Sequence, residues 1–288
     1  MLQRTLSNIT ASPFHPGFLG EGHRALAVMD GVPYADSDPF IVFMDDRIDL
    51  AGGEPAGGPH PHAGFETLTL VLKGNEIDWH TGSFELMTAG KGIIHTEEIT
   101  AEQHVHILQV WLALPPERRW AQPYWQQILL PEVPTLKGEN QEIRVYSGSS
   151  NGLTAPLKNH TPLTVVDFRV DINQTVRQEI PGHYTGLIYV LSGAVGVGDG
   201  IVKAGQTGWL QKGATTAEAE IWFTAQEAGT HFVFYAAKPH NKPILSYGPF
   251  VADTTEDITR LYREYRNGQM PHLNDLPPEQ KVNYSAKT

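Results

Sequence analysis

Residues 58–74 read GPHPHAGFETLTLVLKG, in which two histidines flank a proline and a run of strand-forming residues follows. Successive side chains of a strand point to opposite faces, so residues of equal parity share a face. That face is polar at its start and apolar at its end, and it comprises His60, His62, Gly64, Glu66, Leu68, Leu70 and Leu72. The pattern predicts one wall of a barrel, with imidazoles at the mouth of a ligand cavity and leucines deeper inside.

A second stretch, MTAGKGIIHTE at residues 87–97, supplies further side chains that bind metals. His95 and Glu97 stand two residues apart and would share one face of a strand. Three neutral imidazoles and one carboxylate hold a divalent first-row metal and leave coordination positions open for a substrate. Parity alone does not decide whether Glu66 or Glu97 is the carboxylate ligand. The two stretches together predict one catalytic metal site.

A His-x-His pair by itself is weak evidence, because most such histidines lie on the surface or form ordinary hydrogen bonds. The chain contains a second pair, His104 and His106, in HVHILQVWLAL at residues 104–114, where apolar residues occupy both faces. We interpret these two as packed histidines or as hydrogen-bond partners of metal ligands. His80 is expected to face solvent.

Composition and charge exclude several classes of protein. The formal charge of −11 offers no broad cationic surface for phosphates, so direct binding of nucleic acid is not expected. The absence of cysteine excludes disulfides, thiolate metal ligands and a catalytic thiol. No apolar stretch is long enough for a signal peptide or a membrane span, so we expect a cytoplasmic protein without membrane contact.

A chain of 288 residues is long enough for two compact units. The stretches at 67–98 and 186–214 share a pattern, a strand that ends in glycine and then short strands and turns, which indicates an internal duplication. The proline-rich segment 115–142 is interpreted as a linker. We therefore expect one β unit at residues 1–130 and a second at 131–288.

Near the end of the chain the pattern changes to that of a helix. Thr254 followed by Asp257 is a helix start signal, and apolar residues then recur at helical spacing until Gly268. The sequence predicts a helix at 254–267. The remaining tail has little periodicity and is expected to be extended or mobile.

The two histidine stretches resemble the motifs of the pirin family, a branch of the cupins. The first is similar to the cupin pattern His-x-His-x(3)-Glu followed by Gly, and MTAGKGIIHTE resembles the second pirin motif. Other stretches resemble pirins in the same order along the chain, namely DPFIVFMDD at 38–46, HILQVWLALP at 106–115, PYWQ at 123–126 and GPFVADTTEDITRLYREYRNGQ at 248–269.

The resemblance implies an all-β bicupin, with two antiparallel β-sandwich or jelly-roll barrels and a C-terminal helix. It implies one metal ion in the first barrel, most often Fe(II), although Zn, Mn, Co, Ni or Cu suit the same ligands. The family's ligands carry over to His60, His62, His95 and Glu97. Glu66 would then support these ligands through hydrogen bonds.

The sequence departs from the family in two places. In the second half Glu179 and Pro181 stand where the duplicated pattern has the two histidines, so the second barrel is expected to hold no metal. The segment 75–86 is shorter than in pirins, which puts the identity of the substrate in doubt.

Two kinds of function follow from the resemblance. The first is a dioxygenase that acts on quercetin or a related flavonol, a small aromatic substrate, together with O2. Glu97 would be both ligand and base, and Leu68, Leu70 and Phe65 would shape the cavity. The alternative is an iron-dependent, redox-sensitive regulator whose acidic surface binds a transcription factor or a metabolic enzyme. The predicted cavity favours the enzyme. A third reading is a metal-loaded protein without activity.

Overall fold

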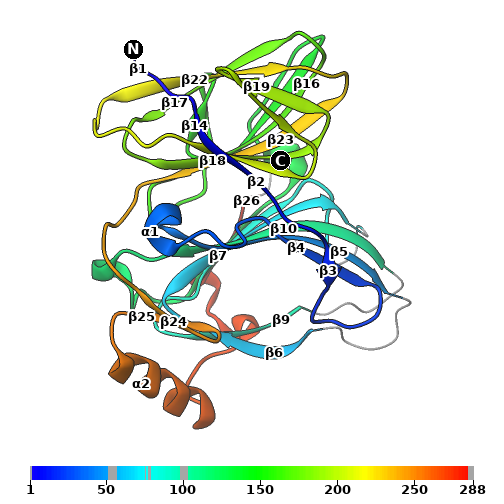
Figure 1. Ribbon diagram of the computed structural model, residues 1–288. Helices are drawn as coiled ribbons and strands as arrows, with labels where there is room; N and C mark the ends of the chain where they lie inside the picture. Colours follow the sequence, from blue (N-terminus) through cyan, green and yellow to red (C-terminus); the bar gives the residue numbers. More distant parts are fainter. Residues whose placement is uncertain (1, 51–56, 75, 77–78, 98–102, 285–288) are drawn as a thin grey trace. The chain divides into compact units, whose positions relative to one another are not determined.

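The computed structural model describes residues 2–50, 57–74, 76, 79–97 and 103–284 (Figure 1). They form two compact units whose parts alternate along the chain. The unit that contains both histidine stretches, called the histidine unit below, comprises Phe14–Ala27, Phe40–Glu132 and His240–Thr288. The companion unit comprises Met1–Pro13, Val28–Pro39 and Val133–Pro239.

The expected units, 1–130 and 131–288, are each continuous in sequence, whereas each unit of the structure combines three separate segments of the chain. The segment at the start of the chain pairs with companion strands, since β2 (Leu6–Ala11) lies beside β21 (Gln206–Leu210). The last strand, β26 (Lys281–Tyr284), pairs instead with β11 (Tyr124–Ile128) of the histidine unit. Such long-range pairing leaves no local signal in a sequence.

The histidine unit is built on an eight-stranded sheet. Its order is β26, β11, β8 (Phe84–Thr88), β7 (Phe65–Lys73), β10 (Gln103–Ala113), β5 (Phe40–Leu50), β4 (His23–Ala27) and β3 (His15–Pro16). Two-stranded ribbons complete it, β6 (Gly57–His62) with β9 (Ile93–Glu97) and β24 (Leu245–Tyr247) with β25 (Phe250–Ala252). All these pairs are antiparallel except β11 with β26. The segment 115–142, expected to be a linker, thus contributes β11 to the main sheet.

The companion unit contains a seven-stranded and a five-stranded sheet. The first has the order β12 (Thr135–Lys137), β13 (Gln141–Ser147), β16 (Leu163–Val170), β23 (Thr230–Ala237), β18 (Thr185–Ser192), β21 and β2. The second comprises β1 (Leu2–Gln3), β22 (Glu218–Ala225), β19 (Ala194–Val197), β20 (Gly200–Lys203) and β17 (Thr175–Pro181). A hairpin, β14 (Ser149–Ser150) with β15 (Leu153–Thr154), and a short helix, α1 (Tyr34–Ser37), are added. Buried aromatic side chains such as Phe168, Phe223 and Phe232 fill its core.

The helix α2 (Thr255–Arg266) confirms the prediction at 254–267. Thr254 caps it, since its side-chain oxygen accepts a hydrogen bond from the backbone N–H of Asp257 at 3.1 Å. Ile258 and Leu261 are buried against Phe250 of β25, beside which α2 lies in Figure 1. Short 3-10 turns, η1 (Pro116–Arg118), η2 (Leu130–Glu132), η3 (Leu273–Asp275) and η4 (Pro278–Gln280), complete the described secondary structure.

A break at Gly64 separates β6 from β7 and decides which side chains meet the histidines. Gly64 has φ of +86°, a conformation that favours glycine, and its carbonyl oxygen accepts hydrogen bonds from Leu114 and Arg119. The strand expected to run without interruption therefore belongs to two different sheets. Side chains alternate regularly within β6 and within β7, but residues of equal parity on the two strands do not share a face.

A buried carboxylate in the companion unit gives a testable pH dependence. Burial opposes the charge of Asp167, but His231, Arg169 and Arg144 outweigh it and hold the pKa of Asp167 below its ordinary value. The stability from this charge is therefore present above pH ~4 and is lost as the pH falls through the lower folded-state pKa.

We expect Asp167→Asn to cost about 1–3 kcal/mol of unfolding free energy at pH 7, because Arg144, Arg169 and His231, which are only partly exposed, lose the charged acceptor that they share. The difference in unfolding free energy between the variant and the wild type should become smaller below pH ~4. Urea unfolding between pH 3 and pH 7 measures this, with Asp199→Asn in an exposed turn as the control. A gap that does not change with pH would contradict the assignment.

Candidate metal centre

The ribbon of β6 and β9 brings three histidines together. His60 on β6 lies directly opposite His95 on β9, and His62 follows two residues along the same strand. The ring centroids are 4.3 Å apart for His60 and His95 and 4.9 Å apart for His62 and His95. One nitrogen from each ring lies within 4.8 Å of the others. Such spacing lets three imidazoles bind a single ion.

Aromatic side chains fix the position of His62. Its ring is buried and contacts Phe65 and Trp111, with centroids 5.2 and 5.0 Å away. Phe65 and Trp111 stack on each other at 4.4 Å. On the other side, the Nδ1 atom of His60 is 3.0 Å from the Gly58 carbonyl oxygen, which leaves Nε2 for a ligand. The rings are therefore held in place before any ion binds.

The nitrogen atoms of this group suit a metal. Nδ1 of His62 and Nε2 of His95 are buried, and neither has a hydrogen-bond partner among the described residues. Burial, together with the neighbouring His60, lowers the pKa of His62 to about 3, and burial near the other two rings lowers the pKa of His95 well below its ordinary value. The rings of His62 and His95 are thus neutral at physiological pH, and neutral imidazole is the form that coordinates metals.

Glu97 lies at the end of the same strand as His95 but outside the group of three nitrogens. Its Oε1 atom accepts a hydrogen bond from Nε2 of Gln109 at 3.0 Å. Burial raises the pKa of Glu97, against the opposing effects of His60 and Gln109. A carboxyl group with a raised pKa is a stronger base than an ordinary carboxylate, which suits it to proton transfer beside the imidazoles.

Glu66 lies on β7 of the main sheet and not on the ribbon that carries the histidines. Its side chain is fully buried, and Oε1 accepts a hydrogen bond from Oγ1 of Thr88 at 2.9 Å. Glu66 shares its parity with Leu68 and Leu70, whose side chains are also buried. The residues between them, Thr67 and Thr69, line the cavity described next. Glu66 is thus on the opposite face of β7 from that cavity.

A cavity of about 300 Å³ opens beside His95 and Glu97. Its wall combines aromatic and apolar side chains with hydroxyls and two carboxyls, and it comprises Thr67, Thr69, Trp79, Glu85, Met87, His95, Thr96, Glu97, Trp125, Leu273 and Asn274. The expectation that Leu68 and Leu70 shape the cavity is wrong, because the break at Gly64 turns the odd-numbered residues of β7 toward it. Phe65, also odd, does contact His62.

Sequence reasoning missed most of the cavity wall. Glu85 and Trp125 come from β8 and β11, and Leu273 and Asn274 come from the tail, so no single stretch contains them. The one available signal was Gly64, since a glycine inside a strand pattern often marks a bulge or a break.

The other histidines of this unit pair with acidic residues. His104 is exposed and lies 2.8 Å from Asp49, and the Nε2 atom of His106 lies 2.8 Å from Asp45. His80 is 41% exposed and lies 3.6 Å from Glu76, which agrees with its expected solvent-facing position. Residues 75, 77 and 78 of the shortened segment lie outside the described residues.

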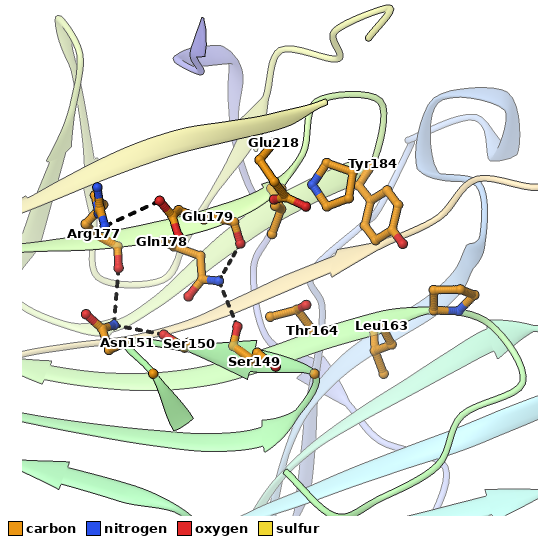
Figure 2. A pocket seen from close by; sticks show the side chains of 15 residues that line it. Ser149, Ser150, Asn151, Leu163, Thr164, Arg177, Gln178, Glu179, Tyr184 and Glu218 are labelled. Carbon is orange, nitrogen blue, oxygen red and sulfur yellow. Dashed lines mark hydrogen bonds and ion pairs between the residues drawn. The ribbon is translucent and has the colours of Figure 1, made fainter. Parts of the chain in front are cut away.

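The companion unit has a larger cavity, of about 640 Å³, at the position that corresponds to the histidines in the duplicated pattern. Glu179 lies on its wall and forms an ion pair of 3.3 Å with Arg177 (Figure 2). Gln178, between them in sequence, donates to the Ser149 carbonyl oxygen at 3.0 Å. Within the described part of the chain, the three histidines are the only group of three or more side chains that could hold a metal.

Comparisons with known proteins agree with this architecture. A family model described as pirin matches residues 32–112, and one described as pirin C-terminal cupin domain matches residues 165–271. Human pirin is 32% identical over 265 residues, which cover 87% of this chain and 89% of the human protein. A Vibrio cholerae protein named "Putative quercetin 2,3-dioxygenase" is 31% identical over 278 residues, which cover 89% of this chain and 94% of that protein.

A solved structure supports the fold. Quercetin 2,3-dioxygenase from Acinetobacter baumannii is similar over 93% of this chain and 98% of its own, with a TM-score of 0.80 and 24% identity. The prediction of an all-β chain with two cupin domains is confirmed. In the described residues, no helix is both long enough and apolar enough to span a membrane.

Proposed function

The chain belongs to the pirin family, and from its histidine cluster and cavity we propose that it is a metal-dependent dioxygenase of quercetin or a related flavonol. The observation that carries the proposal is the set of three converging imidazoles beside a cavity with aromatic walls. The similar Vibrio cholerae protein supports the substrate class. The reaction would convert a flavonol and O2 into a depside and carbon monoxide, so both atoms of O2 enter the products.

We assign the metal ligands to His60, His62, His95 and Glu97. Fe(II) is our first choice, and the same donors suit Zn, Mn, Co, Ni or Cu. When bound, the ion supplies Lewis-acid and redox chemistry for the reaction of a deprotonated flavonol with O2. Trp79 and Trp125 provide flat apolar surfaces on which an aromatic substrate can lie.

Glu97 is our candidate for the base that accepts the proton of the flavonol hydroxyl. Gln109 donates to Oε1, which leaves Oε2 and the second lone pair of Oε1 for the metal and for the proton of the substrate. The raised pKa of Glu97 reduces the mismatch with a phenolic hydroxyl, which aids proton transfer. The hydrogen bond from Gln109 also fixes the plane of the carboxylate.

The first test is aerobic loss of quercetin absorbance with detection of carbon monoxide, using protein reconstituted with ferrous iron and the same protein after chelation. Turnover that depends on the metal supports the dioxygenase. Absence of turnover, with one ion bound per chain, would move the assignment to a different substrate or to the redox-sensitive regulator with a protein partner.

Glu97→Gln tests the base. We expect turnover to fall by about 10²–10⁴-fold, because the amide cannot accept the proton. Phe18→Ala, at an exposed position of the same unit, should leave turnover near the wild-type level. Measurement of turnover and metal content on the same samples separates the roles. A loss of turnover that merely follows metal loss would assign Glu97 as a ligand only.

A further inference from the structure

Glu85 is a second carboxyl group in the cavity, and the proposed reaction does not use it. It lies on β8, and its Oε1 atom accepts a hydrogen bond from Nε2 of Gln127 at 2.7 Å. The side chain of Trp125 also hydrogen-bonds this carboxyl. Two donors on the sheet therefore hold Glu85 in one orientation against the cavity.

The last strand of the chain orients this arrangement. Nδ2 of Asn283, on β26, donates to Oε1 of Gln127 at 3.1 Å. Since the oxygen of the Gln127 amide is occupied, its NH2 group is turned toward Glu85. A chain of two hydrogen bonds thus runs from the tail of the protein to the cavity wall. Holding a carboxylate in this way prepares it to accept a further hydrogen bond from a ligand.

The strand register shows where Glu85 stands relative to the metal centre. Glu85 lies opposite Thr69, and Thr69 lies opposite Gln109, the residue that holds Glu97. Two strand spacings separate the backbones of Glu85 and Gln109, which amounts to about 10 Å. A ligand that contacts both Gln109 and Glu85 would therefore extend across two strand spacings, which matches a molecule with two or three fused or linked rings.

We propose that Glu85 determines substrate choice, by accepting a hydrogen bond from a hydroxyl group on the part of a polyphenol that lies farthest from the histidines. This inference rests on the proposed function and deepens it, since it requires a hydroxyl in addition to the one that reacts. An aromatic molecule without that hydroxyl would leave a desolvated carboxylate oxygen unpaired, which weakens its binding.

The experiment compares two probes with the same skeleton, quercetin and 3-hydroxyflavone, of which the second keeps only the hydroxyl next to the reacting carbon. Binding to the full-length, ferrous protein is measured without oxygen by quenching of tryptophan fluorescence, because Trp79 and Trp125 line the cavity. The dissociation constant reports binding separately from turnover.

We expect the wild type to bind quercetin about 10- to 100-fold more tightly than 3-hydroxyflavone, the range for leaving a buried polar group without its hydrogen bond. Glu85→Met should bring this ratio close to one by weakening quercetin alone. Glu85→Gln, whose amide oxygen keeps the bond from Gln127 but whose NH2 group replaces the second carboxyl oxygen, should give an intermediate ratio. If Glu85 only supported the fold, its replacement would weaken the binding of quercetin and of 3-hydroxyflavone equally.

Tyr284→Phe is the matched control. The Tyr284 hydroxyl donates to Oε1 of Gln126 at 3.1 Å. Like the bond between Asn283 and Gln127, this bond joins the tail to β11, but Gln126 points to the opposite face of β11 from Gln127. The ratio should stay at the wild-type value. A ratio that Glu85→Met leaves unchanged, or a wild type that binds both probes equally, would overturn the role of Glu85 while the dioxygenase stands. A wild type that binds neither probe would overturn both.

Discussion

Replacing His62 by alanine is expected to abolish stoichiometric metal binding while the fold of the histidine unit stays almost as stable as before. Loss of one of three imidazoles should weaken metal affinity by more than about 100-fold, since even residues that only support ligands contribute 10- to 100-fold. Nδ1 of His62 has no partner among the described residues, so its removal breaks no hydrogen bond at that atom. The variant loses packing against Phe65 and Trp111 and the hydrogen bond between the His62 ring and the backbone of Pro249, at a cost of about 1–3 kcal/mol.

Metal content per chain after ferrous reconstitution, together with urea unfolding of the metal-free protein, measures both effects. His62→Gln keeps most of the volume of the side chain and should lose metal in the same way. His104→Ala removes a histidine from the other His-x-His pair, which faces Asp49, and should keep one ion per chain. Full metal loading in both His62 variants would contradict the site.

The histidine group could be predicted from the sequence because its geometry is local. His60 and His62 lie on one short strand, and two-residue spacing places them on one face whatever the rest of the chain does. His95 could be added because it lies on a second short strand in a recognisable motif. Spacing does not show to which sheet a strand belongs, and this is what distinguishes Glu66 from Glu97. Glu66 lies on β7 of the main sheet, and Glu97 lies on β9, which pairs with β6.

The cavity wall could not be predicted, for two physical reasons. The parity of β7 is reset at Gly64, so the threonines and not the leucines face the cavity. The tail also contributes, although it has no periodicity. Met270 and Leu276 are buried in the histidine unit, and η3 supplies Leu273 and Asn274 to the wall. Isolated apolar anchors between turns give no periodic pattern, so the packing of Met270 and Leu276 could not be predicted, whereas the expected extended conformation is found in β26.

Gly64→Ala is the change for which we expect the largest effect on stability. A Cβ atom at this position would lie 1.8 Å from the carbonyl oxygen of Val251, a backbone atom that cannot rotate away. The variant also has to adopt a left-handed φ that costs a non-glycine residue about 1–2 kcal/mol, and forced displacement of packed groups adds about 1–3 kcal/mol. Urea unfolding should therefore show a loss of roughly 2–5 kcal/mol.

Gly64→Ala should weaken metal binding as well as stability, because Gly64 joins the strand that carries His60 and His62 to the main sheet. Gly20→Ala separates the two causes: Gly20 has a similar φ of +90°, but nothing lies within 4 Å of an added Cβ. Gly20→Ala should lose only the roughly 1–2 kcal/mol of unfolding free energy that the left-handed φ costs, and it should still bind one metal ion per chain. Equal losses in the two variants would mean that the close approach of Val251 is relieved by a small backbone shift. The break at Gly64 would then be tolerant of a side chain, and the reset of parity would depend on its φ alone.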